Sequence, residues 1–277
     1  MDRLSVRGID LKGRKLAAKS LCVITNHKTG TVWLRRVFQA VARTQGKQLH
    51  LAQRPEDADR IRALIEDGTC FLFAGNGVRP KVLDDCETIR FVFSVRDPRD
   101  VLLSGLNYHL LHSPTPKSPE AIIHTPRDRF GGLTYQQKLR SLPDRLAQLR
   151  FEMTHIHSRT VKKMLAWDYS DHRNIEWRYE DMMNDVEMIR FARMLQQLGY
   201  EAKAIEDMSV AFREESLFGS RSRTAQSSQH ILSGQLHRWK SELPYEFAQL
   251  YAKQFGHALV GLGYEVDQTW VERLRET

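Results

Sequence analysis

The sequence predicts an α/β protein in which a central parallel β-sheet is flanked by helices. Compact runs of apolar and β-branched residues at 21–25, 70–74 and 89–95 alternate with segments of helical periodicity. Two of these runs lead straight into a polar turn that opens a helix, at residues 26–31 and 96–98. Strands that alternate with helices build parallel sheets, and ligands gather at the carboxyl ends of such strands.

The first part of the chain contains four predicted strands and two predicted helices. The helix after the second strand buries one face through the spacing of Val37, Phe38 and Val41. In chain order we expect a lead-in strand at 4–9, a strand at 21–25, a helix that reaches Arg43, a short strand at 48–51, a helix that Pro55 opens and Gly68 ends, and a strand at 70–74.

The apolar run at 89–95 is the clearest strand of the chain, because it is β-branched and aromatic throughout. The helix that follows, expected at 98–110, begins with Asp97 as N-cap, Pro98 as first helical residue and Asp100 in a capping-box position. Later elements are expected as helices at 135–150 and 151–167, a strand at 174–179, helices at 186–198 and 203–217, a polar loop at 218–234 and a helix at 245–262.

Residues 112–132 are rich in proline and paired glycine and interrupt the alternation of strands and helices. A loop of this length in a compact domain is usually a functional lid or a disordered excursion. We predict a lid or insertion here. Because no linker is present elsewhere, residues 1–277 are expected to form one domain.

Composition narrows the class of partner. The formal net charge of +8 favours an anionic ligand or surface, although a mildly basic surface alone explains it equally well. The basic residues are spread along the chain and form no basic helix, which favours a small polyanion over nucleic acid or a membrane. The three cysteines have no metal-ligand spacing, and there is no apolar signal or transmembrane run. A soluble, cytoplasmic protein is expected.

The stretch from His27 to Leu34, HKTGTVWL, is the main candidate for an anion-binding turn. It lies between a strand and a helix, where backbone N–H groups and the positive end of the helix converge. Lys28 adds a positive charge, and Thr29 and Thr31 add hydroxyl groups. The nucleotide-triphosphate P-loop ends in Gly-Lys-[Ser/Thr], whereas here Gly30 follows the lysine.

Two motifs resemble the sulfotransferase family. HKTGTVW resembles its 5′-phosphosulfate loop, typically P-K-[ST]-G-T-T-W-L, and RDPRDVLLSGL at 96–106 resembles its 3′-phosphate segment. The resemblance implies donor-binding roles for Lys28 and for Arg96 and Ser104. It also implies donor contacts from the rest of the loop, which comprises Thr29, Gly30, Thr31, Val32 and Trp33. Taken alone, Arg96 suits an ion pair with Asp97 or Asp100 equally well.

Two later stretches extend the resemblance to about residue 265. Arg178-Tyr179-Glu180-Asp181 resembles a segment whose tyrosine lies against the adenine, although Tyr179 also suits simple packing at a sheet edge. GQLHRWK at 234–240 resembles the late R-K-G-x-x-G-D-W-K segment, whose early residues close over the 3′-phosphate; Gly234 and Trp239 are retained, and Ser233 and Gly234 are the implied contacts. The Arg-Lys pair is absent, because Leu232 and Ser233 stand there, and His230, Arg221 or Arg223 are the candidates to supply its charge.

The resemblance implies a P-loop-NTPase-like sulfotransferase fold. The implied enzyme moves a sulfuryl group from 3′-phosphoadenosine 5′-phosphosulfate (PAPS) to a hydroxyl, or less readily an amine, and releases 3′,5′-adenosine bisphosphate (PAP). Lys28 is the implied catalytic cation, because charge builds on the leaving oxygen. No metal is expected. The acceptor is expected to be a small molecule, glycan or lipid, and no sequence signature identifies it or the oligomeric state.

The general base is the least determined part of the site. The family's usual histidine position holds Asn76, so we assign the base to His50 on the short strand at 48–51, although His50 also suits a core position. Asp57 and His124 remain alternatives. Tyr108 and His109 resemble an acceptor-pocket edge.

Three other classes stay open on sequence grounds. A P-loop nucleotide kinase shares the sheet and the phosphate turn but lacks the Gly-Lys-[Ser/Thr] ending here. A nucleic-acid-binding protein explains only the charge. A sulfotransferase-like protein that binds the nucleotide without catalysing transfer fits the asparagine at residue 76.

Overall fold

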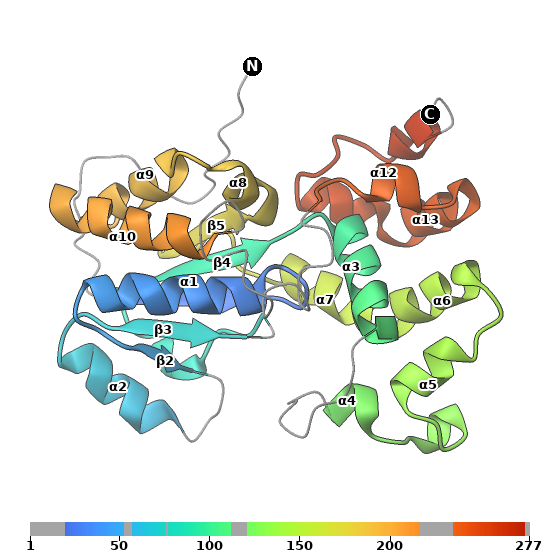
Figure 1. Ribbon diagram of the computed structural model, residues 1–277, viewed down its shortest axis with the longest axis horizontal. Coiled ribbons are helices and arrows are strands. Elements are labelled where there is room, and N and C mark those ends of the chain that lie inside the picture. The colour runs from blue at the N-terminus through green and yellow to red at the C-terminus, as the bar shows by residue number, and fades with distance from the viewer. Residues whose placement is uncertain (1–19, 53–56, 76, 112–120, 217–234, 275–277) are drawn as a thin grey trace. The chain divides into compact units, whose positions relative to one another are not determined.

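The computed structural model describes residues 20–52, 57–75, 77–111, 121–216 and 235–274 (Figure 1). The strand predicted at 4–9, the loop at 218–234 and the first part of the lid therefore lie outside the described residues. The chain forms two compact units. The first contains residues 1–96 and 166–234, and the second contains residues 97–165 and 235–277. The single domain stays a prediction.

The first unit is built on a five-stranded sheet in which every pair of neighbouring strands is parallel. The spatial order is β2-β3-β1-β4-β5. This confirms the predicted α/β class. The strands are β1 (Ser20–Thr25), β2 (Leu49–Leu51), β3 (Phe71–Ala74), β4 (Ile89–Val95) and β5 (Asn174–Arg178).

The order of the strands determines where a ligand site forms. After β3 the chain passes from one side of β1 to the other and adds β4 and β5 there. In open α/β sheets ligands bind at such a switch point, beyond the carboxyl ends of the strands. Those ends are level here, because Thr25 of β1 is in register with Ser94 of β4.

Helices of the first unit bury a continuous aromatic core against the sheet. Helix α1 packs against α10 (Figure 1). Phe38, Trp177, Phe191 and Phe212 form the centre of this core, with the rings of Trp177 and Phe191 stacked 5.6 Å apart. The helices are α1 (Thr31–Thr44), α2 (Ala58–Glu66), the 3₁₀ turn η2 (Lys81–Leu83), α8 (Tyr179–Asn184), α9 (Ile189–Gln197) and α10 (Ala202–Glu215).

The second unit is helical in its described residues. Its elements are α3 (Pro98–Leu111), α4 (Ala121–His124), η3 (Asp128–Phe130), α5 (Tyr135–Arg140), α6 (Arg145–Glu152), the π-helical turn η4 (Met153–His157), α7 (Ser158–Leu165), α12 (Trp239–Glu242), α13 (Tyr245–Gly261) and η6 (Thr269–Leu274). Part of the predicted lid is thus ordered as α4 and η3, while its role as a lid stays a prediction.

Several boundaries differ from the sequence prediction. The helix predicted at 135–150 is two helices, because Pro143 breaks it and Asp144 caps a new one by accepting a hydrogen bond from the Ala147 N–H at 2.8 Å. Helix α9 begins at residue 189 because Met188 has φ 57°. Tyr179 opens α8 and does not end the strand. No helix of the described residues is long and apolar enough to cross a membrane.

Candidate functional site

The loop between β1 and α1 is held in shape by its own hydroxyl groups. The Thr29 hydroxyl accepts a hydrogen bond from the Asn26 N–H at 2.9 Å and donates to the Asn26 carbonyl at 3.0 Å. The Thr31 hydroxyl donates to the same carbonyl at 3.0 Å. Thr29 is fully buried. Its hydroxyl therefore stabilises the loop. Any contact of Thr29 with the donor is then expected from its backbone.

Gly30 leaves the N-terminus of α1 open. It is the N-cap residue at φ 96°, has no capping side chain, and the first helical turn contains no acidic residue. Hence the first N–H groups of α1 have no side chain of the N-cap residue and no carboxylate of the first turn to bind. A Cβ at this position would lie 3.3 Å from the rings of Trp33 and Tyr179, in a conformation that only glycine adopts readily. The loop thus has the geometry of an anion cradle.

Three predicted donor-site residues that are far apart in the sequence meet at this loop. The Arg96 Nη1 donates to the Lys28 carbonyl at 3.3 Å, and its guanidinium carbon lies 4.4 Å from the centre of the Tyr179 ring. Tyr179 also meets Trp33 edge to face at 5.9 Å. Consequently the carboxyl ends of β1, β4 and β5 place a lysine, an arginine and two aromatic rings together.

Two further residues support the loop and were not predicted from the sequence. The Ser94 hydroxyl on β4 donates to the Thr29 carbonyl at 2.7 Å, which ties the loop to the neighbouring strand. The Asn26 carboxamide is fully buried, and neither of its polar atoms has a hydrogen-bond partner among the residues that the structure describes. A Cβ on Gly77 would lie 2.0 Å from the Asn26 Oδ1. The glycine at residue 77 was the only sequence signal for this close approach.

The other predicted loop residues have distinct surroundings. Val32 is 49% exposed, so its side chain is free of the core, whereas Trp33 is buried. Lys28 is half-buried and has φ 63°, a left-handed conformation that is uncommon for a residue with a Cβ. Such strain is found most often at functional sites.

Ser104, Tyr108 and His109 all lie on α3 in the second unit, but they do not share one face. Ser104 and Tyr108 are one turn apart and half-buried, so they are neighbours on the helix surface. His109 is 1% exposed and points into the interior of its unit. The structure therefore places Ser104 and Tyr108 together on the helix surface, whereas His109 is buried and its ring meets that of Tyr108 edge to face at 5.5 Å.

His109 forms part of a buried network that joins three helices. Its Nδ1 lies 2.8 Å from the Glu152 Oε2 on α6, and the Tyr135 hydroxyl on α5 donates to the same oxygen at 2.7 Å. The Glu152 carboxylate only accepts hydrogen bonds, so the His109 Nδ1 carries the proton in this contact. Burial and Glu152 raise the pKa of Tyr135 well above its ordinary value. This network stabilises the helical unit.

His50 lies on the edge strand β2 beside an arginine. The Arg60 Nη1 is 3.5 Å from the His50 Nδ1, and the Arg60 Nη2 donates to the Asp57 Oδ1 at 2.9 Å. Since arginine only donates, the imidazole accepts at Nδ1. Partial burial, and then the charge of Arg60, lower the pKa of His50 below its ordinary 6.5.

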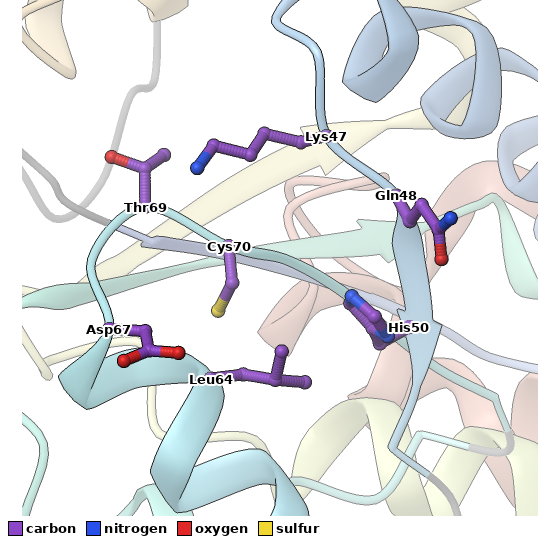
Figure 2. A pocket seen from close by; sticks show the side chains of 7 residues that line it. All are labelled: Lys47, Gln48, His50, Leu64, Asp67, Thr69 and Cys70. Atoms are coloured by element: carbon purple, nitrogen blue, oxygen red, sulfur yellow. The ribbon is translucent and has the colours of Figure 1, made fainter.

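The side chain of His50 lines a cavity of about 160 Å³ (Figure 2). The other lining residues come mainly from the chain just before β2 and β3: Lys47, Gln48, Leu64, Asp67, Thr69 and Cys70. In a parallel sheet this is the edge opposite the carboxyl ends of the strands. His50 is level with Leu72 and Cys22, three residues before the end of β1. These positions lend no support to His50 as the base, and that role stays a prediction.

Replacing His50 tests the role directly. If His50 is the base, His50→Ala lowers the rate of transfer by about 100-fold or more. The rate then also falls with acid as the imidazole is protonated, at a pH below its ordinary pKa because partial burial and then Arg60 lower the pKa. Arg60→Gln removes that charge, raises the pKa of His50 and moves the fall to higher pH, while the exposed Arg62→Gln leaves the profile unchanged. A wild-type rate for His50→Ala removes His50 from the mechanism.

The remaining predicted residues lie outside this geometry. Ser233, Gly234, His230, Arg221, Arg223 and Asn76 are not among the described residues. His124 is half-buried at the end of α4. Within the described part of the chain, no group of three or more His, Cys, Asp or Glu side chains is arranged to hold a metal ion.

The architecture is that of the sulfotransferases, as the sequence motifs predicted. The structure matches mouse sulfotransferase SULT7A1 complexed with PAP, at a TM-score of 0.52 and 15% identity, over 90% of this chain and 87% of that one. Retinol dehydratase is also similar, with androsterone and inactive cofactor PAP (TM-score 0.47, 14% identity) and with retinol and PAP (0.46, 15%), each over 87% of this chain and 81% of that one. No family model matches the sequence, and no curated protein matches it.

Proposed function

We propose that this protein is a PAPS-dependent sulfotransferase that sulfates a hydroxyl, or less readily an amine, of a small-molecule, glycan or lipid acceptor. The observation that supports this most strongly is the meeting of Lys28, Arg96 and Tyr179 at the open N-terminus of α1. These residues come from three separate motifs that the resemblance assigns to one nucleotide. Their contact is what a single donor site requires.

The loop suits the phosphosulfate of the donor. The uncapped N–H groups of α1, the lysine at residue 28 and the absence of acid from the first helical turn all favour a bound anion. Gly30 is needed because a Cβ there would crowd the rings of Trp33 and Tyr179, which lie against the turn. In this proposal Thr29, Gly30, Thr31, Val32 and Trp33 bind the donor through their backbone, and the ring of Tyr179 lies against the adenine.

When bound, PAPS supplies a sulfuryl group that is attached through a bridging oxygen to the nucleotide phosphate, which is a good leaving group. In transfer the bond from sulfur to the bridging oxygen breaks, a bond from sulfur to the acceptor oxygen forms, and the acceptor proton passes to a base. Lys28 and the N–H groups of the loop stabilise the negative charge that develops on the bridging oxygen. Arg96 and Ser104 hold the 3′-phosphate and thereby orient the donor. Tyr108, beside Ser104 on α3, is proposed to contact the acceptor.

Thermal unfolding with nucleotides tests the proposal. PAP without magnesium is expected to stabilise the protein by about 2.7 kcal/mol when its concentration is 100 times its dissociation constant. ATP with magnesium should have little effect, because the lysine and glycine are in the wrong order for a triphosphate loop. Stabilisation by ATP and magnesium without any by PAP would identify a nucleotide kinase instead.

A second candidate is a protein that binds the same nucleotide but does not catalyse transfer. The position of His50 favours this candidate. His50 lines the cavity near the amino ends of the strands, so the predicted base lies away from the loop at their carboxyl ends. Stabilisation by PAP, together with no release of PAP from PAPS in the presence of phenols, alcohols and amines, would establish this alternative.

A further inference from the structure

His237 has an unusual backbone for a residue with a side chain. It lies just before α12 at φ 58°, in the left-handed region, and its side chain is exposed. In the late family segment that GQLHRWK resembles, this position is a glycine, which adopts such a conformation without strain. Histidine is one of the few residues with a Cβ that are enriched in this region, and here it adds an exposed imidazole.

The conformation is enforced by Asp100. This buried carboxylate on α3 accepts hydrogen bonds from the His237 N–H at 2.8 Å and from the Trp239 N–H at 3.1 Å. The sequence predicts a different role for Asp100, as a capping-box acid within α3. Its side chain also fixes residues 237–239 against the start of that helix.

Asp100 also locates His237 relative to Ser104. Residues four apart on a helix are neighbours, with Cβ atoms roughly 5–6 Å apart. His237 is therefore held by a residue that lies one helical turn before Ser104 on the same face of α3.

Two cations near this face form ion pairs with carboxylates. Arg99 is buried between Asp97 and Glu265, with hydrogen bonds of 2.7 and 2.6 Å. Arg238 binds both carboxylate oxygens of Glu242, at 2.6 and 2.8 Å. Among the described residues, by contrast, none forms a hydrogen bond or ion pair with the imidazole of His237.

We propose that His237 binds a phosphate monoester together with Ser104, and that Asp100 is its positioning residue. This rests on the proposed function, in which the monoester is the 3′-phosphate of the donor. An imidazole N–H donates to a phosphate oxygen and supplies a contact that the missing Arg-Lys pair does not. Asp100 acts only by holding the backbone of residue 237.

The test compares the affinities of PAP and 5′-AMP, which differ by the 3′-phosphate. His237→Gly removes the imidazole but suits the left-handed backbone, so the fold is expected to persist, which the melting temperature checks. We expect PAP binding to weaken about tenfold or more, as for loss of a hydrogen bond to a charged group, and AMP binding to stay unchanged. His237→Lys is expected to keep most of the preference for PAP.

Two controls separate positioning from general effects. The neighbouring exposed Lys240→Ala removes a charge and should leave the ratio of the two affinities unchanged. Asp185 is a buried aspartate that accepts two backbone N–H groups elsewhere, from Arg190 and Phe191. Asp100→Ala and Asp185→Ala should both lower stability, but only the first should lower the ratio.

The outcomes are distinct. A wild-type preference for PAP that survives in His237→Gly overturns the assignment and leaves the proposed function standing. Equal loss of PAP and AMP binding in that variant also overturns it, because the role is then structural. If the wild-type protein binds no PAP, the proposed function fails, and this assignment fails with it.

Discussion

Replacing Lys28 with alanine is expected to lower the rate of sulfuryl transfer by about 100- to 1,000-fold, the usual effect of removing one group that stabilises developing negative charge. Lys28 follows β1 in the loop that Arg96 contacts. Alanine also has a Cβ, so the substitution does not change the preference for the left-handed backbone at φ 63°. The measurement is PAP released from PAPS with an acceptor that the wild-type protein uses.

The controls for Lys28 separate chemistry from binding. Lys47→Ala removes an exposed lysine near the opposite strand ends and should leave the rate unchanged. PAP should still stabilise Lys28→Ala, although less than the wild-type protein, because the N–H groups of α1 remain. A rate within a few-fold of wild type would mean that the loop binds the donor without assisting the leaving oxygen.

Replacing Arg99 with alanine is expected to destabilise the protein by about 3–5 kcal/mol, because it leaves buried charge without a partner. Arg99 donates to Asp97 and Glu265, and its guanidinium carbon lies 3.5 Å from the centre of the Trp239 ring. Burial lowers the pKa of Arg99, but the two carboxylates outweigh it and raise the pKa overall. The melting temperature should fall by roughly 10 °C or more.

An exposed ion pair provides the matched control. Arg190 lies 2.6 Å from Asp181, but both side chains are more than a third exposed. Arg190→Ala should therefore cost less than about 1 kcal/mol. Arg99→Lys keeps the charge but loses the planar fork and the stacking on Trp239, so an intermediate loss is expected. Equal effects of Arg99→Ala and Arg190→Ala would contradict this account of the helical unit.

The sheet and the donor loop were predictable because their signals are local. Strand β4 is apolar throughout, and the order of Lys28 and Gly30 distinguishes the loop from a triphosphate-binding loop. The contact of Arg96 with Lys28 was implicit in the same prediction, because the carboxyl ends of neighbouring parallel strands meet. Pro143 also indicates the break between α5 and α6, although the sequence prediction placed a single helix there.

The rest of the site depends on partners that are distant in the sequence. Asp100 was predicted to cap α3, but its hydrogen bonds to the N–H groups of His237 and Trp239, 137 and 139 residues later, were not predicted. His109 was predicted beside Tyr108, and their rings do meet edge to face at 5.5 Å, but the buried contact of His109 with Glu152 was not predicted. The local sequence pattern does not indicate partners that are so distant in the sequence, so neither role was predicted.

Calorimetric titration with PAP in the presence of a chelator tests the central claim most directly. The account predicts one binding site per chain, weaker binding of 5′-AMP because it lacks the 3′-phosphate, and a further loss of affinity for PAP in Arg96→Ala. No heat of binding from PAP, or equal affinity for PAP and AMP in the wild-type protein, would contradict the assignment of this loop to an activated sulfate donor.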